Sequence, residues 1–173
     1  ELADLCRLNA LANGLAPGTL TLCADLLRGP VLDHASMDCI YTNPPFFERD
    51  EAPASPEPAR ADAHVMPIGG QEVWLAAAIR ALRPRGRLAL IQRADRLGAC
   101  LSALAAGMGA VTVMPIHPRA DAPASRILVT AVKGARAPLR LRPPLILHGP
   151  DGGFTEQAEA IHRGAADLAE DGR

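Results

Sequence analysis

The sequence predicts an α/β fold in which helices cover both faces of a mostly parallel β-sheet. Helical and β-favouring segments alternate along the 173 residues, an order typical of such sheets. The composition fits one folded domain, because 49% of the residues are hydrophobic and the net charge is only −1. The last two predicted strands have no helix between them, so we expect them to pair antiparallel.

Local patterns place the individual elements. Leucines recur at helical spacing over 2–13, which predicts a helix that ends at Asn13-Gly14. Further helices are predicted over 71–82 and 95–106, the second capped by Asp95. Residues 48–63 contain several prolines and charges and predict a loop, and the chain beyond Gly134 is polar before a helix-like tail. Short apolar, β-favouring runs predict strands at 19–24, 37–42, 87–92, 110–116 and 126–132.

Composition also excludes several classes of protein. No apolar run reaches the ~20 residues that a membrane-spanning helix needs. The four cysteines form no CxxC pair, which favours buried free thiols in the cytoplasm and no metal site. The near-zero net charge argues against a general nucleic-acid binder. Lys133 is the only lysine among the 18 basic residues; the excess of arginine suits phosphate contacts but also fits a bias in composition.

The chemistry is expected at the end of the strand 37–42. Ligands of a parallel sheet collect beyond the carboxyl ends of its strands, and Asn43-Pro44-Pro45-Phe46 follows this strand directly. The two prolines fix φ and hold Asn43 and Pro44 extended, so that the Pro44 carbonyl and the Asn43 amide both face the crevice. Asp25, at the end of the predicted strand 19–24, is a second candidate at the same edge.

Two neighbouring acceptors match the two hydrogens of an exocyclic NH2 group. Gripping them would stabilise the positive charge that grows on nitrogen as it attacks an electrophile. Phe46 would stack on a flat ring just beyond, while Tyr41 would pack in the sheet. The alternatives are a Pro-Pro turn that closes a strand over a core Phe46, and an Asp25 that only forms a turn.

These residues resemble a known family. The run Tyr41 to Phe46 is similar to the Asn-Pro-Pro-Phe/Tyr motif of class I S-adenosylmethionine-dependent methyltransferases that modify amino or amide nitrogens. Residues 83–88 resemble the segment that leads into the fifth strand of that fold. The stretches 115–119, 123–129 and 145–152 resemble bacterial valine-tRNA adenine-N6 methyltransferases, and the likeness covers about residues 1–164.

The resemblance implies roles for individual residues. Asn43, Pro44 and Pro45 would hold the target amine, and Phe46 would stack on a base flipped out of an RNA loop. S-adenosylmethionine would be the cofactor and tRNA the partner. Asp25 would accept a hydrogen bond from the cofactor's adenine, with Leu26 and Asn43 beside it. His64 would order the loop over the substrate, and Arg126 would meet RNA phosphate or pair with an acid; Arg93, Arg119, Arg136, Arg140 and Arg142 are further candidates for RNA contacts.

The sequence also departs from the family pattern. It contains no D-x-G-x-G loop, which lets the backbone approach the methionine end of the cofactor. We therefore expect a C-terminal part of a longer protein, lacking the first two strands. Residues 1–135 would be a partial methyltransferase domain and 136–173 its C-terminal extension. The strand 37–42 would then have an open edge, and these residues alone would be inactive and bind S-adenosylmethionine weakly at most.

Other functions remain open. The same Asn-Pro-Pro-aromatic grip would serve methylation of guanine N2 in ribosomal RNA or of a glutamine amide in a protein. From a different class, the chain could be a non-catalytic α/β binding module in which the Asn43 motif is structural. The missing glycine loop is the main support for that alternative.

Overall fold

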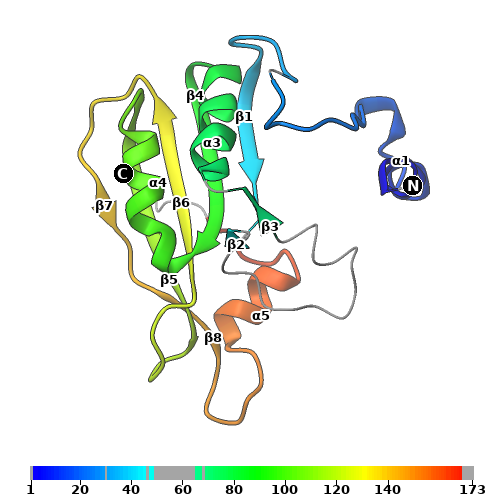
Figure 1. The fold of residues 1–173 in the computed structure, drawn as a ribbon. Coiled ribbons are helices and arrows are strands. Elements are labelled where there is room, and N and C mark those ends of the chain that lie inside the picture. The colour runs from blue at the N-terminus through cyan, green and yellow to red at the C-terminus, as the bar shows by residue number, and fades with distance from the viewer. Residues whose placement is uncertain (1, 30, 46, 49–64, 68, 169–173) are drawn as a thin grey trace. The chain divides into compact units, whose positions relative to one another are not determined.

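The computed structural model describes residues 2–29, 31–45, 47–48, 65–67 and 69–168. Contacts divide the chain into two units, Glu1–Val31 and Leu32–Arg173. The first unit holds helix α1 (Leu2–Ala12) and a 3-10 helix, η1 (Ala16–Gly18). The second unit holds the β-sheet and the other helices (Figure 1).

The predicted N-terminal helix is confirmed, together with its end. α1 closes where Gly14 takes a positive φ of 67°, and the Leu15 N–H bonds back to the Ala10 carbonyl at 2.8 Å. A left-handed residue at this place is the common way to end a helix, and glycine adopts it without a Cβ penalty.

The predicted strand over 19–24 is wrong, because these residues form no regular structure. Leu20 and Leu22 are 81% and 54% exposed, and no described strand pairs with this segment. An alternating sequence becomes a strand only when a neighbour takes up its N–H and C=O groups. Here the threonines bond back toward the helix instead, Thr19 Oγ1 to the Leu15 carbonyl and Thr21 Oγ1 to Cys6 Sγ.

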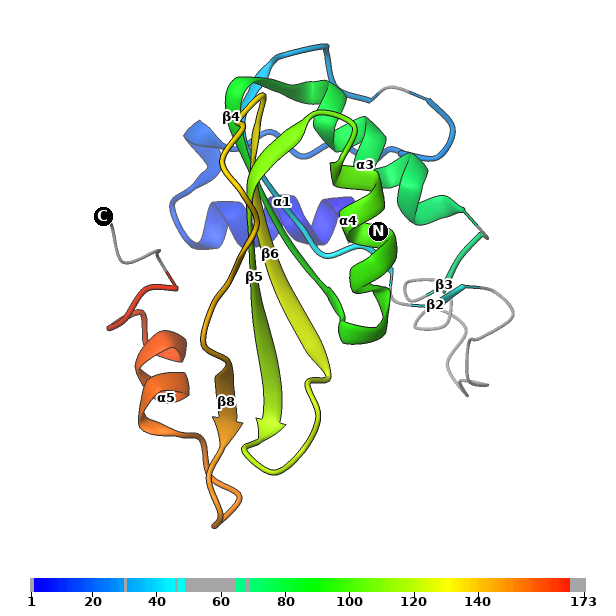
Figure 2. The ribbon, with the colours of Figure 1, turned by 90° about the vertical axis from the view of Figure 1, so that its left-hand side faces the viewer.

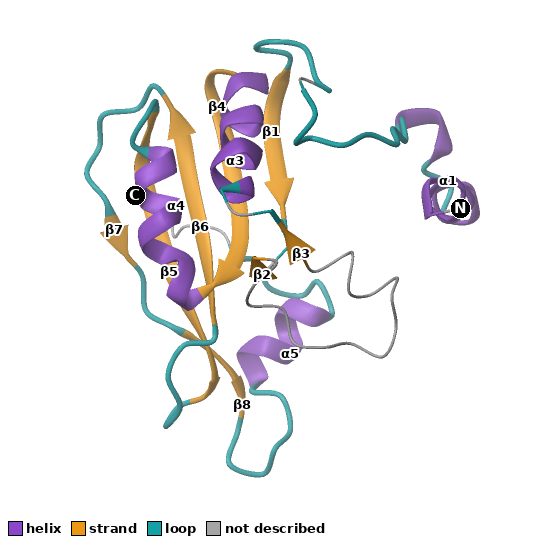
Figure 3. Cartoon of the chain, viewed as in Figure 1, coloured by secondary structure: helices purple, strands orange, loops and turns teal. Residues whose placement is uncertain are grey.

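The second unit contains the predicted mixed sheet (Figure 3). Its strands lie in the order β1-β4-β6-β5-β7, and β8 also pairs with β5. β1 runs parallel to β4, and β7 and β8 run parallel to β5, whereas β6 is antiparallel to both of its neighbours. The α/β class and the antiparallel pair are therefore confirmed, and β1 is an edge strand among the described strands. The bounds are β1 Met37–Thr42, β4 Leu82–Arg93, β5 Met108–Arg119, β6 Arg126–Lys133, β7 Arg140–Leu141 and β8 Leu145–His148.

Helices cover the sheet on both sides, as Figure 2 shows. α3 (Gly70–Ala81) and α4 (Leu97–Leu104) lie on one face, and α5 (Glu156–His162) lies on the other. The main core joins Leu75 and Leu104 of the helices to Leu88 and Leu90 of β4, all fully buried. Burial of each such side chain contributes roughly 2 kcal/mol. A smaller core under α5 contains Met114, Ile116 and Leu145.

The boundaries of β4 differ from the prediction. This strand begins at Leu82 rather than Arg87, so residues 83–86, which separate the predicted helix from the predicted strand, form a bulge inside β4. Arg85 takes a positive φ of 69° there, and a Cβ on Gly86 would lie 2.9 Å from the Arg83 carbonyl oxygen. The bulge therefore requires a glycine at position 86, as β-bulges often do.

Asp95 does not cap the helix that follows β4. A 3-10 turn, η2 (Ala94–Arg96), precedes α4, and the residue at the N-cap is Arg96. The Asp95 carboxylate instead accepts a hydrogen bond from Arg93 Nε at 3.0 Å. This hydrogen bond lowers the pKa of Asp95.

Two predictions about burial are also wrong. Cys6, Cys23 and Cys39 are exposed free thiols, and only Cys100 is buried. Tyr41 lies on β1 but is 81% exposed instead of packing in the sheet. On an edge strand with one face uncovered, alternate side chains are exposed to solvent. The apolar residues next to Tyr41 in the sequence do not show whether a helix covers that face.

Short strands surround the least regular parts of the sequence. β2 (Phe47–Glu48) and β3 (Val65–Met66) form a small parallel pair, and most of the predicted loop between them, residues 49–63, lies outside the described residues. The stretch after Gly134, expected to be irregular before a helical tail, contributes β7 and β8 as well as α5.

Candidate active site at the carboxyl end of β1

The predicted motif begins where β1 ends. β1 stops at Thr42, whose register partner on β4 is Leu90, and Asn43 follows immediately. Asn43 is exposed, Pro44 is fully buried and Pro45 is half-buried. Side chains alternate along an extended chain, so Asn43 shares the open face with Tyr41 while Thr42 and Pro44 turn inward. Phe46 lies outside the described residues.

Thr42 is tied to helix α3. Its Oγ1 accepts a hydrogen bond from Trp74 Nε1 at 2.8 Å. The indole nitrogen can only donate, so the direction of this bond is fixed. Thr42, which precedes Asn43, is therefore held by a side-chain hydrogen bond, and Pro44, which follows it, is held by burial.

β4 ends beside this motif with a buried amide. Gln92 is fully buried, two residues beyond the partner of Thr42, and its Oε1 accepts the Arg93 N–H at 2.8 Å. Within the part of the chain that the structure describes, its Nε2 has no hydrogen-bond partner. The β1–β4 ladder ends at Thr42 and Leu90, so Gln92 lies two residues beyond its last paired position.

Arg126 begins β6 and reaches the same end of the sheet. Arg126 is the register partner of Arg93 in the antiparallel pairing of β6 with β4. Arg93 lies three residues beyond Leu90, the β4 partner of Thr42. Arg126 is half-buried and its Nη1 donates to the Ser125 carbonyl at 2.9 Å. Arg93 forms an ion pair with Asp95.

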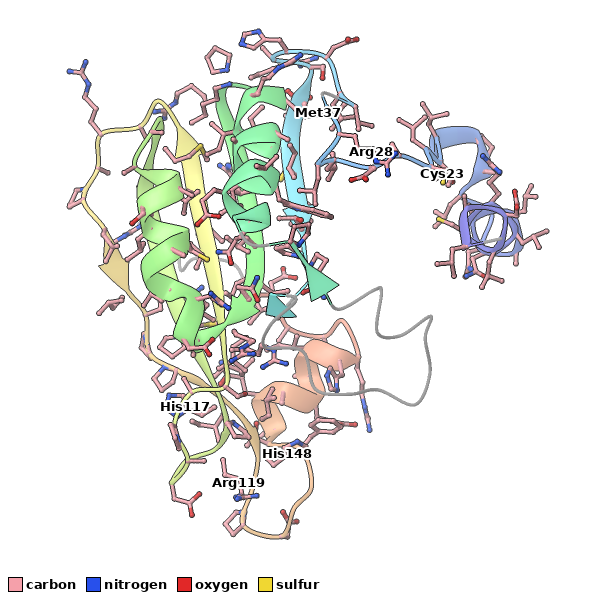
Figure 4. All side chains as sticks on the ribbon, viewed as in Figure 1. Cys23, Arg28, Met37, His117, Arg119 and His148 are labelled. Atoms are coloured by element: carbon pink, nitrogen blue, oxygen red, sulfur yellow. The ribbon has the colours of Figure 1, made fainter. Side chains whose placement is uncertain are left out.

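The end of the sheet that holds Asn43 extends along β5 and β8. Figure 4 labels Met37 at the amino end of β1, and Arg119 and His148 at the opposite end of the sheet. Arg119 and His148 are register partners, and Arg119 lies 3.7 Å from the Asp121 carboxylate. The imidazole of His148 stacks on Phe154, which in turn meets His162 edge to face, so these rings mainly pack on one another.

Asp25 and Leu26 belong to the Glu1–Val31 unit and are described within it. The Asp25 carboxylate accepts the Leu27 N–H at 2.9 Å and pairs with Arg28 Nε at 3.1 Å. This is the geometry of an Asx turn, and Asp25 does not end a strand. Leu26 is half-buried. His64 lies outside the described residues.

Sequence reasoning missed Gln92 and Trp74. The polar Gln92 at the end of the apolar run Leu88 to Ile91 was a usable signal, because a buried strand seldom ends on an unpaired amide. Trp74 gave no such signal, since its contact with Thr42 joins residues far apart in the chain.

Other polar features of the described residues are simpler. Gln71 Nε2 donates to Cys100 Sγ at 3.0 Å, and burial raises the pKa of the Cys100 thiol to about 11. Among the described residues, no three His, Cys, Asp or Glu side chains gather where they could hold a metal ion. No helix in the described part of the chain is long and apolar enough to cross a membrane.

Comparison with solved structures identifies the architecture. A predicted O-methyltransferase from Agrobacterium tumefaciens superposes with a TM-score of 0.70 at 26% identity, over 98% of this chain and 76% of that one. The fold is that of class I methyltransferases. No protein-family model matches the chain, and no curated protein matches it.

Two further structures share the fold at lower identity. A SAM-dependent O-methyltransferase from Thermotoga maritima gives a TM-score of 0.51 at 15% identity, over 78% of this chain and 46% of that one. A chain described as a modification subunit of a type I restriction enzyme, from Vibrio vulnificus, gives 0.52 at 16% identity, over 96% of this chain and 39% of that one. In a sheet of this type the carboxyl ends of the strands form the ligand crevice, and Asn43 lies at such an end.

Proposed function

We propose that this chain carries the target-binding part of a methyltransferase that transfers a methyl group from S-adenosylmethionine to an exocyclic amine of a nucleic-acid base. The observation that carries the proposal is the exposed Asn43 at the carboxyl end of β1, between the anchored Thr42 and the buried Pro44. S-adenosylmethionine is the methyl donor in this proposal, as it is for the Thermotoga maritima neighbour.

The grip on the target follows from the chemistry of amides. Asn43 Oδ1 and the Pro44 carbonyl each accept one N–H of the target amine, which frees its lone pair for attack on carbon. Both acceptors also stabilise the positive charge that nitrogen gains as the new bond forms. The surplus proton then leaves the nitrogen for solvent, because neither an amide nor a peptide carbonyl is a base near neutral pH.

The residues of the chain fit the target side of such a site better than the cofactor side. The cofactor supplies a methyl group on a positively charged sulfur. Asp25 is the candidate for its adenine, although this carboxylate already serves the Asx turn with Leu27 and Arg28. The 173 residues contain no D-x-G-x-G loop for its methionine end.

The specific acceptor we propose is adenine N6 in tRNA. The similarity of residues 115–119 and 123–129 to valine-tRNA methyltransferases supports this choice. Phe46 and His64 would cover the base, and Arg126 would contact phosphate. Residues 136–173 would belong to the same catalytic domain as the rest of the sheet, since their strands β7 and β8 pair with β5.

Transfer to a hydroxyl is the second candidate, because two of the structural neighbours are described as O-methyltransferases. A hydroxyl offers one hydrogen rather than two, and attack by oxygen calls for a base that removes it. Asn43 is not a base. The two acceptors at Asn43 and Pro44 therefore favour nitrogen over oxygen.

A transfer assay separates these functions. The intact protein is incubated with methyl-labelled S-adenosylmethionine and, in parallel, with total tRNA, ribosomal RNA, DNA or protein extract. We expect label in tRNA, a loss of roughly 100-fold for Asn43→Ala, and wild-type transfer for Asn9→Ala, an exposed asparagine on α1. Label in DNA or protein would reject the tRNA acceptor. Transfer that survives Asn43→Ala would reject the grip, and no transfer to any pool would favour a binding module.

A further inference from the structure

The position of the Asn43 side chain must be fixed by other residues of the site. This side chain is exposed just beyond the last residue of β1, where the ladder to β4 has ended and the backbone is less restrained than inside a strand. A group that grips a reacting amine must nevertheless hold its place to within about half an ångström. Some contact outside the exposed side chain must therefore fix the Asn43 backbone.

The contact with Trp74 meets that requirement. Trp74 Nε1 donates to Thr42 Oγ1 at 2.8 Å, one residue before Asn43. A β-branched threonine has few χ1 rotamers, so fixing its Oγ1 also fixes the local backbone. On the other side of Asn43, Pro44 is fully buried and its ring restricts φ.

Helix α3 provides a rigid support for Trp74. One turn before Trp74, Gln71 donates to Cys100 Sγ of α4 at 3.0 Å, and the next residue after Trp74, Leu75, is fully buried in the main core. At the other end of the helix, Lys133 Nζ donates to the carbonyls of Ile79 and Leu82 at 2.7 and 2.6 Å. Helix α3, which carries the Trp74 indole, is therefore held by hydrogen bonds near both of its ends.

We propose that Trp74 is a positioning residue for methyl transfer: through its hydrogen bond to Thr42 it holds the backbone that presents Asn43 to the target amine. The inference rests on the proposed function and adds a residue of a different element to that site. Trp74 acts through Thr42 and does not itself contact the target.

The test deletes the hydrogen bond from either side while keeping bulk. Trp74→Phe removes the donor, Thr42→Val removes the acceptor, and the pair is combined in a double variant. We expect kcat to fall about tenfold in each, with little change in KM, and the double variant to lose no more than either single one, because all three lack the same bond. Thr42→Ser restores the hydroxyl and should restore kcat.

The matched control is Thr155→Val. Thr155 Oγ1 donates to the Ile146 carbonyl at 2.7 Å and caps α5 on the opposite face of the sheet, so this variant loses a comparable bond outside the site. We expect its thermal midpoint to fall while kcat stays unchanged. If Thr42→Val and Trp74→Phe behave like Thr155→Val, Trp74 is only structural and the inference is overturned. An inactive wild type, or a wild type indifferent to Asn43→Ala, would instead reject the proposed function itself.

Discussion

Gln92 is fully buried near the end of β4, and its amide nitrogen has no hydrogen-bond partner among the described residues. A buried donor without an acceptor costs about 1–3 kcal/mol, so this residue is expected to weaken the fold. Methionine has a similar shape and no donor. Gln92→Met also removes the acceptor of the Arg93 N–H, so we expect the gain and the loss nearly to cancel, with the free energy of unfolding changed by less than about 1 kcal/mol in urea denaturation.

Gln71 provides the comparison for Gln92. It is also a buried glutamine, but its Nε2 donates to Cys100 Sγ at 3.0 Å. Gln71→Met should lower the free energy of unfolding more than Gln92→Met does, because it removes a bond to Cys100 and relieves no unpaired Nε2 donor. Equal losses in the two variants would show that Gln92 Nε2 has a partner in solution, such as a buried water.

The cysteines differ in environment, and their reactivity should follow. Cys6, Cys23 and Cys39 are exposed, whereas Cys100 is buried and its pKa is raised to about 11. Thiolate is the reactive form, so at pH 8 Cys100 is both covered and almost fully protonated. A chromogenic disulfide reagent should react fast with three thiols in the native protein and with the fourth only after unfolding. Fast reaction of all four, unchanged by denaturant, would contradict this burial.

At the scale of elements, Lys133 of β6 closes the C-terminus of α3. Its ammonium donates to the carbonyls of Ile79 and Leu82, which have lost their partners in the helix. Bonds from a charged donor contribute about 1.5–3 kcal/mol, and a cation at this helix end also complements the dipole. We expect Lys133→Met to lower the free energy of unfolding by about 2 kcal/mol in a urea titration with an unchanged slope.

Arg136→Met is the control for Lys133→Met. Arg136 is an exposed cation in the segment after β6, and its substitution should change the unfolding free energy by less than about 0.5 kcal/mol. Similar small effects for both variants would mean that the Lys133 bonds are exchanged freely for water.

Elements whose bounds follow from local sequence patterns could be predicted, whereas elements that depend on pairing with a distant strand could not. Strand β1 was predicted to the residue, because Pro44 and Pro45 cannot continue a ladder. The false strand at 19–24 has an equally good local pattern but no neighbour to pair with. β7 is two residues long and exists only through its pairing with β5, which no local pattern reveals.

The candidate site divides in the same way. Asn43 could be placed at the crevice from its position after a strand in an α/β fold, which is a rule of whole-sheet geometry. The residue that we propose to fix it, Trp74, comes from α3 and meets β1 only in the folded structure. Side-chain burial at an edge strand was the weakest part of the prediction, as Tyr41 shows.

At the scale of the whole molecule, the class I methyltransferase fold brings the ends of β1, β4, β5 and β8 to one edge, where Asn43, Gln92, Arg119 and His148 lie. Under the proposed function, that edge would bind a base and its flanking phosphates, with Asn43 holding the amine. The central claim is therefore that the methyl group goes to an exocyclic nitrogen and depends on the Asn43 amide.

The identity of the methylated nucleoside tests this claim most directly. The intact protein is incubated with S-adenosylmethionine and total tRNA, and the RNA is digested to nucleosides and analysed by mass spectrometry. We predict N6-methyladenosine with the wild type and with Asn9→Ala, and a yield lower by roughly 100-fold with Asn43→Ala. A methyl group on a hydroxyl oxygen, or an undiminished yield of N6-methyladenosine with Asn43→Ala, would contradict it.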